Sequence, residues 1–335
     1  MLFRPIAPLL LLLCATACNP SKRFTLPVQQ QGHAATTWTW TESPASPLLT
    51  RGPAGSWDSV DVLNPSVVRW RESYWNLYSG FDGKTWHTGV AQSADGLSWQ
   101  RKGKVLSPDP ASWEGTYIAA NGAVLADSPQ RLSYWYQGGR PVPSIGLARS
   151  SDGLSWSKEK APVLAPGPRG SWDERGVADP YVIQIGGELY LYYTGMDRAL
   201  RQRLGVARSS DGIRWEKSLD NPLLDIGGHQ QWDEGGLGEP AVWTSGNSYW
   251  MLYTGRAWDE TRRLGLAQSV DGIHWKKLPT AVFEGKQPWN QSVLCDPTVE
   301  MTSQGTLRVW YGGGNKPSPD ENLNGQIGLA TLTPK

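Results

Sequence analysis

Residues 89–99 read GVAQSADGLSW, and this stretch decides the fold because close copies of it recur along the chain. The copies lie at residues 146–156, 205–215 and 265–275, and a truncated one lies at residues 328–330. A unit repeated at intervals of roughly 60 residues is one supersecondary element that cannot bury its apolar face alone. The chain is therefore expected to be an array of similar units, with function where the copies differ.

Each copy of the unit contains four short runs that are typical of strands. An apolar run begins seven residues after a leading Trp, and a second run ends in Tyr-x-Gly, as at residues 78–80. The quoted stretch is the third run, and its Asp-Gly is a strong hairpin signal because such turns need positive φ. Each unit is therefore predicted to be a four-stranded antiparallel meander. The leading residues are Trp57, Trp113, Trp172, Trp232 and Trp289.

The last copy lacks its fourth run, and the N-terminal part of the chain is expected to supply it. Trp40 precedes Pro47 by the spacing that separates Trp215 from Pro222. A last unit completed by the first strand closes a ring and removes exposed sheet edges. The predicted fold is all-β: a five-bladed β-propeller of four-stranded antiparallel blades over residues 37–335, with the ring closed by the N-terminal strand. A β-sandwich would not account for the equal repeats.

The first residues have the layout of a secretory signal peptide, predicted to span residues 1–17. Arg4 is the basic region, an apolar run follows, and small residues precede Cys18. This arrangement resembles a bacterial lipoprotein site and predicts lipidation of Cys18, with export and anchoring to a membrane or cell surface. Ordinary cleavage with an incidental Cys18 is the alternative. Residues 18–36 are polar and are expected to form the lipidated Cys and a flexible tether.

Composition limits the classes of partner. The formal charge of +1 over 335 residues gives no electrostatic footprint for nucleic acid. After signal removal, Cys295 is the only Cys besides Cys18, which excludes a disulfide within the folded part. No His and Cys cluster has zinc spacing, so no metal and no cofactor are expected.

Polar residues stand at the start of the first strand of every unit, where a propeller lines its channel. Acids that share such a channel raise each other's pKa and can serve as acid and base, a pair that glycoside hydrolysis needs. A purely structural role predicts one residue type in every copy, which the observed mixture fits less well. In the second unit the position falls on Ala120 or on Asn121, of which we take Asn121. The column is Asn64, Asn121, Asp179, Glu239 and Asp296.

Other acidic residues recur unchanged between copies and are expected to be structural. One set precedes Gly in the hairpin turn, and a second set follows the leading Trp. The first set is Asp95, Asp152, Asp211 and Asp271, and the second is Asp58, Asp173 and Asp233.

The chain resembles the five-bladed propeller glycoside hydrolases over residues 37–335: arabinanases, xylosidases, invertases, levansucrases and the mannoside phosphorylases. The Ser-x-Asp-Gly-x-x-Trp turns, Asp179-Pro180 and Glu239-Pro240 carry the resemblance. It implies that Glu239 is the general acid and that Asp179 tunes its pKa and orients substrate. By resemblance alone, a structural calcium ion in the channel is also allowed.

The general base of the arabinanase-like enzymes has no counterpart here, because Asn64 occupies its position. Three explanations are open. Asp296 takes over as base, or phosphate replaces activated water as in the phosphorylase branch, or the cavity binds sugar without cleaving it.

Loops that follow Tyr-x-Gly contact substrate in these enzymes. Arg256 and Trp258 are the preferred candidates, because sugar sites combine a planar donor with a stacking aromatic ring. Arg140 is a further candidate for substrate binding, together with the column residues Asn64 and Asn121. His87 and Asp61 are weaker candidates. The remaining loop residues are Phe81, Asp82, Asp197, Arg198, Asn315 and Lys316.

The leading hypothesis is an anchored glycoside hydrolase that acts on a furanoside or pentose-containing glycan of plant or microbial origin. The alternatives are a glycoside phosphorylase and a non-catalytic carbohydrate-binding propeller. The expected partner is an oligo- or polysaccharide, with membrane contact through the lipid anchor only. A monomer is expected by analogy with other propellers.

Overall fold

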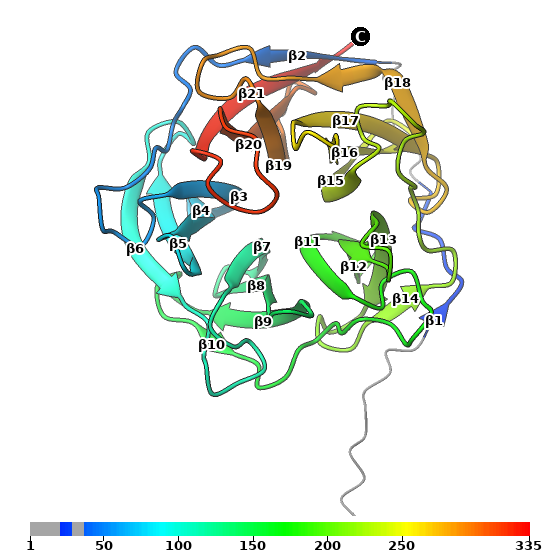
Figure 1. Cartoon of the computed structure of the whole chain (residues 1–335), viewed down its shortest axis with the longest axis horizontal. Helices are drawn as coiled ribbons and strands as arrows, with labels where there is room; N and C mark the ends of the chain where they lie inside the picture. Colours follow the sequence, from blue (N-terminus) through cyan, green and yellow to red (C-terminus); the bar gives the residue numbers. More distant parts are fainter. Residues whose placement is uncertain (1–20, 29–36) are drawn as a thin grey trace, which may run out of the picture.

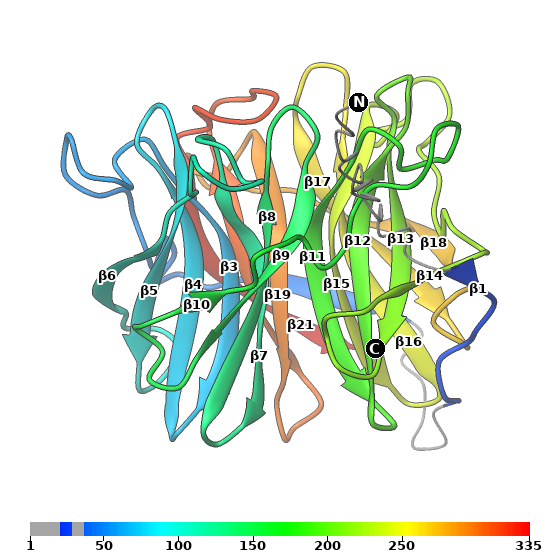
Figure 2. The ribbon, with the colours of Figure 1, turned by 90° about the horizontal axis from the view of Figure 1, so that it is seen from below.

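The computed structural model describes residues 21–28 and 37–335, and every regular element among them is a β-strand. These residues contain no helix long and apolar enough to cross a membrane. The sheets stand around a common axis (Figure 1), and their strands run along that axis with loops at both ends (Figure 2). The fold is all-β and propeller-like, in agreement with the fold class expected from the repeats.

The strands pair in the order of the repeats. One sheet contains β3 (Asp61–Trp70), β4 (Ser73–Phe81), β5 (Trp86–Ser93) and β6 (Gln100–Leu106). The next contains β7 (Ala119–Ser128), β8 (Arg131–Gly138), β9 (Ser144–Ser150) and β10 (Ser157–Lys158). A third contains β11 (Gly176–Ile185), β12 (Glu188–Met196), β13 (Gln202–Ser209) and β14 (Glu216–Ser218), with β1 (Ser21–Lys22) added to β14.

The last two repeats share one larger sheet. Its first part contains β15 (Gly236–Ser245), β16 (Ser248–Arg256), β17 (Arg262–Ser269) and β18 (Lys276–Phe283). Its second part contains β19 (Val293–Met301), β20 (Leu307–Gly314), β21 (Gln326–Pro334) and β2 (Trp38–Glu42). The pair Arg262 and Val293 joins the two parts. The antiparallel pairing of β2 with β21 places the N-terminal strand on the last repeat, where the spacing around Trp40 predicts it.

The first strands of the five repeats, β3, β7, β11, β15 and β19, lie nearest the central axis (Figure 1). Residues on these strands are therefore the ones that can reach a central cavity.

The Asp-Gly turns at the outer side of the repeats are closed by the Asp side chain. Asp95 Oδ1 accepts hydrogen bonds from the backbone N–H groups of Leu97 and Ser98, each at 2.8 Å. Gly96 has a φ of 73°, which a residue with a Cβ adopts at a cost. The same contacts recur in three other repeats, where they are made by Asp152, Asp211 and Asp271. These four acids therefore have a structural role.

Each leading Trp packs across two glycines of the neighbouring strands. A Cβ on Gly80 would lie 2.3 Å from the Trp57 ring, and a Cβ on Gly89 would lie 2.1 Å from it. The glycines of Tyr-x-Gly and of the third-strand phrase are therefore required by this close approach, which explains why they recur in every repeat.

Gly89→Ala is expected to lower the free energy of unfolding by about 1–3 kcal/mol, because the new methyl group overpacks the Trp57 ring. Gly228→Ala is the matched control, since a Cβ there meets no atom within 4 Å. Denaturant unfolding of both variants checks this, and equal midpoints for the two would contradict the packing argument.

The residue after each leading Trp is buried and pairs with a polar residue on the fourth strand of its repeat. Asp173 Oδ2 lies 2.5 Å from Lys217 Nζ and accepts a hydrogen bond from the Tyr193 hydroxyl at 3.2 Å. In the last repeat the acid stands on the fourth strand and the donor follows the Trp, because Asn290 Nδ2 donates to Glu42 Oε1 of β2 at 3.1 Å. The polar partner on the fourth strand is thus kept even where a distant segment supplies that strand. The other pairs are Asp58 with Arg101, Glu114 with Lys158, and Asp233 with Lys277.

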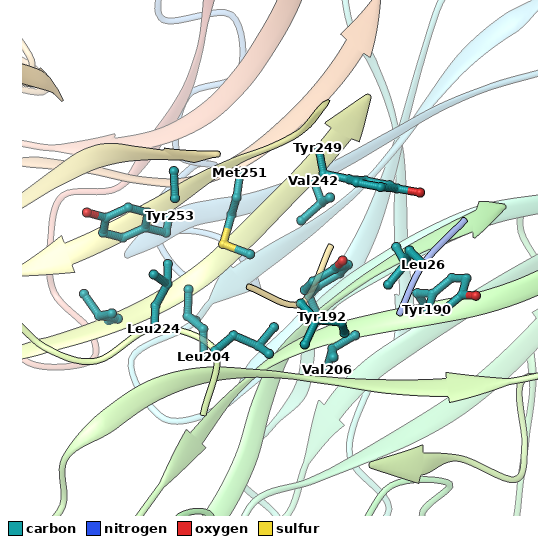
Figure 3. Close-up of a cluster of buried hydrophobic side chains, with 14 of the residues drawn as sticks. Leu26, Tyr190, Tyr192, Leu204, Val206, Leu224, Val242, Tyr249, Met251 and Tyr253 are labelled. Atoms are coloured by element: carbon teal, nitrogen blue, oxygen red, sulfur yellow. The ribbon is translucent and has the colours of Figure 1, made fainter. Parts of the chain in front are cut away.

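The N-terminal segment 21–28 packs on the protein, although the sequence predicts a flexible tether over residues 18–36. Leu26 is 1 % exposed, and it joins a cluster that includes Tyr190 and Tyr192 (Figure 3). The Leu26 N–H donates to the Asp271 carbonyl at 2.8 Å. Burial of these apolar side chains outweighs the polar composition that suggested a tether. The predicted signal peptide, Cys18 and residues 29–36 lie outside the described residues.

Candidate functional site

The five column residues share an unusual backbone conformation. Each lies at a register shift in a first strand, a β-bulge, and has a positive φ between 47° and 53°. Asn and Asp tolerate this left-handed region, whereas a Glu there is uncommon. Such strain persists where the surrounding structure imposes it, and it often marks a functional site. The residues are Asn64, Asn121, Asp179, Glu239 and Asp296.

The bulges bring all five column residues to one central cavity with a volume of about 380 Å³. The structure therefore gathers the residues that the sequence placed at one level of the channel. It also places Asn121, and not Ala120, at the cavity wall in the second repeat.

A chain of hydrogen bonds links Asn64, Asp296 and Glu239 across three repeats. Asn64 Nδ2 donates to Asp296 Oδ1 at 2.7 Å, and the Asn64 N–H donates to Asp296 Oδ2 at 3.2 Å. The Asp296 N–H in turn donates to Glu239 Oε2 at 3.1 Å. The Cys295 thiol donates to Asp296 Oδ2 at 3.1 Å. Asp296 is thus enclosed by protein donors on both of its carboxyl oxygens.

The enclosure of Asp296 makes it a poor general base. Its side chain is 6 % exposed, and burial together with the charge of Glu239 raises its pKa well above the ordinary value of 3.8. Both of its oxygens already accept hydrogen bonds from Asn64 and Cys295, so neither is free to take a proton from water. The hypothesis that Asp296 replaces the missing base therefore finds no support in this geometry.

Asp179 has the electrostatics of a proton donor at neutral pH. Burial, and then the negative charge of Glu239, raise its pKa from the ordinary 3.8 to about 7. Hydrogen bonds from Thr194 and Asn121 partly oppose this shift. Asp179 and Glu239 are both only partly buried and both line the cavity. They therefore form a pair of carboxyls that interact through their charges and that a ligand in the cavity can reach.

Arg262 at the start of β17 is a cavity residue that sequence reasoning missed. Burial alone would lower its pKa, but the nearby Glu239, Cys295 and Asp296 raise it. Its guanidinium Nη2 donates to the carbonyls of Ser318 and Pro319 in the loop between β20 and β21. The position three residues before the third-strand Gly lines the cavity in other repeats too, and that spacing was the available signal. Its occupants there are Trp86, Pro143 and Gln202.

The three predicted loop residues have different placements. Arg256 lines the cavity, with its Nη1 3.4 Å from Glu260 Oε2. Arg140 also lines the cavity, and its guanidinium lies 4.0 Å from the centre of the Tyr117 ring. Trp258 is 73 % exposed and is not part of the cavity wall, so a role in stacking would lie outside the cavity.

The weaker candidates make structural contacts. His87 Nδ1 lies 3.0 Å from Ser107 Oγ, and its Nε2 lies 3.3 Å from Asp82 Oδ2. Asp61 is fully buried and accepts hydrogen bonds from the Asn322 and Gly325 N–H groups at 2.6 and 2.7 Å. It therefore holds the loop between β20 and β21 and does not face the cavity.

A calcium ion does not fit the acidic cluster. Glu239, Cys295 and Asp296 bring one ligand atom each within 4.8 Å of one another. Calcium prefers an all-oxygen shell, whereas this group includes a protonated thiol. The Asp296 oxygens are engaged by Asn64 and Cys295, and Arg262 already supplies positive charge.

Comparison with known proteins gives a partial family match. A family described as β-1,4-mannooligosaccharide phosphorylase matches residues 131–202. An uncharacterised protein of Mycobacterium tuberculosis strain H37Rv is 28 % identical over 232 residues, which covers 64 % of this chain and 75 % of that protein. A 1,2-β-oligomannan phosphorylase of Thermoanaerobacter sp. strain X514 is 30 % identical over 132 residues, covering 37 % of this chain and 44 % of that protein.

Solved structures share the fold along most of the chain. A glycosyl hydrolase from Bacteroides ovatus aligns with a TM-score of 0.71 at 16 % identity, covering 91 % of this chain and 96 % of that one. A second structure aligns with a TM-score of 0.70 at 16 % identity, covering 90 % of this chain and 96 % of that one. Its title states that the family of mannoside phosphorylases contains glycoside hydrolases that target β-1,2 mannosidic linkages in Candida mannan. The chain therefore resembles the β-propeller glycoside hydrolases, and over residues 131–202 it resembles the mannoside phosphorylase family among them.

Proposed function

We propose that the protein hydrolyses a mannosidic bond in the central cavity, with Asp179 as proton donor and Glu239 as the base that activates water. The observation that carries the proposal is the pair of carboxyls, Asp179 and Glu239, at one cavity. Burial and the charge of Glu239 raise the pKa of Asp179 to about 7, so Asp179 can hold a proton near neutral pH beside a second cavity carboxyl. Two groups whose environments separate their protonation states supply the acid and base that this reaction needs.

This assignment differs from the one that the resemblance implies, in which Glu239 is the acid. The Glu239 carboxylate accepts a hydrogen bond from the Asp296 N–H, which holds it at the cavity wall. Asn64, which occupies the usual base position, serves instead as a donor to Asp296. Arg256 and Arg140 supply planar donors for sugar hydroxyls at the cavity wall.

The proposed substrate is a manno-oligosaccharide, in place of the furanoside expected from the sequence. The matched family and the Thermoanaerobacter relative are both described as phosphorylases of mannose-containing oligosaccharides. The two solved structures support a glycan substrate through their fold alone.

Phosphorolysis is the second candidate, and it is favoured by the cations in the cavity. Arg140, Arg256 and Arg262 line the same space as Asp179. A phosphate held by such guanidinium groups attacks the sugar directly, so only a proton donor is needed. This candidate explains Asn64 without assigning a base.

The closure of the ring, the export of the protein and its oligomeric state are also part of the proposal. The repeats and the pairing of β2 with β21 support a five-bladed ring closed by the N-terminal strand. The layout around Cys18 supports an exported lipoprotein, and the analogy with other propellers supports a monomer.

Product analysis of the purified protein tests these alternatives. It is incubated with β-1,2- and β-1,4-linked manno-oligosaccharides, with and without inorganic phosphate, and arabinan and fructan serve as furanoside controls. Free mannose that forms without phosphate supports hydrolysis. Mannose 1-phosphate that forms only with phosphate supports phosphorolysis. Binding of the sugars without release of either product would indicate a carbohydrate-binding propeller and would end the enzymatic proposal.

A further inference from the structure

Hydroxyl groups at the ends of the second strands bind the column residues of the following repeat. The Asn121 N–H donates to Ser79 Oγ at 2.9 Å. The Glu239 N–H donates to Thr194 Oγ1 at 3.3 Å. Ser79 and Thr194 both occupy the middle of Tyr-x-Gly, so the repeat architecture directs this side chain at the next bulged amide.

Thr254 is the corresponding residue of the fourth repeat, and the amide that it should bind is that of Asp296. The Asp296 N–H instead donates to Glu239 Oε2. Thr254 is 4 % exposed, and its enclosed hydroxyl oxygen has no hydrogen-bond partner among the described residues. A buried hydroxyl without a partner is unfavourable, so this arrangement calls for an explanation.

The fifth repeat has no unpartnered hydroxyl at the position equivalent to Thr254. Its Tyr-x-Gly carries Gly312, which offers no hydroxyl, and the Asn64 N–H donates to the Asp296 carboxylate. A Cβ on Gly312 would lie 2.7 Å from Asp296 Oδ2, so the glycine makes room for that carboxylate. Among the described repeats, the Asp296 N–H alone donates to a column carboxylate although the preceding Tyr-x-Gly offers a hydroxyl, that of Thr254.

We propose that Thr254 is a positioning residue that takes over the Asp296 N–H when the Glu239 carboxylate moves from it toward substrate. This inference rests on the proposed role of Glu239 in bond cleavage. Thr254 is one of the residues that line the cavity, but its hydroxyl oxygen itself is buried. The equivalent contacts of Ser79 and Thr194 identify the Asp296 amide as the partner of this hydroxyl. The Glu239 carboxylate can then leave the Asp296 N–H without depriving that buried donor of a hydrogen-bond acceptor.

A thermal double-mutant cycle tests the inference without requiring activity. Thr254→Val keeps the shape and removes the acceptor, and it is expected to leave the melting temperature at or above that of the wild type. Glu239→Ala alone leaves the amide to Thr254. The double variant leaves the Asp296 N–H without either acceptor. Its melting temperature should fall by clearly more than the sum of the changes in the two single variants. Additive changes would overturn the inference. Glu239→Ala with Ser79→Ala is the control cycle, which should be additive.

Kinetics on a cleaved mannoside provide the second readout. Thr254→Val is expected to lower kcat about tenfold with KM unchanged, and Thr254→Ser, which retains the hydroxyl, should stay within about twofold of wild type. A wild-type kcat in Thr254→Val would count against the inference. If the wild-type protein cleaves no glycan, the proposed function fails, and the thermal cycle still decides the role of Thr254.

Discussion

Asp179→Asn is expected to lower kcat on a cleaved mannoside by about a thousandfold, which is within the range for loss of a general acid. The amide keeps the shape of the side chain but has no acidic proton to give to the leaving oxygen. Asn is also tolerated at positive φ, and Asn64 and Asn121 already occupy the same bulge position in other repeats. The loss should therefore be chemical and not a consequence of unfolding. Initial rates at saturating substrate measure it.

Two controls accompany this variant. Asp152→Asn makes the same substitution in an exposed turn, where Asp152 Oδ1 accepts the Leu154 and Ser155 N–H groups, and it should leave kcat unchanged. Calorimetric titration with the sugar should show that Asp179→Asn still binds. A variant that retains more than about a tenth of wild-type turnover would remove Asp179 from the role of acid.

The free energy of unfolding is expected to decrease as pH rises from about 4 to 7, with Asp179 contributing at most about 4 kcal/mol. The folded protein holds the Asp179 proton up to a pKa of about 7, whereas an unfolded Asp loses it near 3.8. Between those values the folded state binds more protons than the unfolded state, so raising the pH favours unfolding. Above pH 7 this contribution is fully lost and the curve levels off.

Denaturant unfolding of wild type and Asp179→Asn at a series of pH values measures this contribution. The difference between the two proteins isolates Asp179 from Asp296, whose pKa is raised in the same direction. The variant should be more stable than wild type above pH 7 and should approach it near pH 4. Parallel curves for the two proteins would show that Asp179 ionises normally. The same titration predicts that kcat/KM of wild type decreases above about pH 7, as the acid loses its proton.

The repeat pattern predicted the local structure well because its signals act over short distances. The Asp-Gly turns, the glycines under Trp57 and the alternation of strands depend on contacts within one repeat. The column of Asn64, Asp179 and Glu239 was also predictable, since equivalent positions of equivalent strands must face the same axis.

Other features depend on segments that the chain brings together from far apart. The packing of Leu26 on the third and fourth repeats was hidden by the polar residues around it. Arg262 reaches the acids only because the loop between β20 and β21 and the first strands of neighbouring repeats meet there. Trp258 follows a second strand as predicted, but its loop carries it away from the cavity.

The sequence by itself determined that the five column residues face one cavity, and the tertiary structure decided the pKa of Asp179 and the hydrogen-bond partners of the column. Asp179, Glu239 and Asp296 occupy equivalent positions, yet Asp296 is enclosed by Asn64 and Cys295 whereas Asp179 stays accessible. A carboxyl pKa depends on burial and on the charges facing it, which differ between neighbouring repeats. Periodicity encodes the position of a side chain, but its electrostatic environment is set only when distant repeats pack against one another.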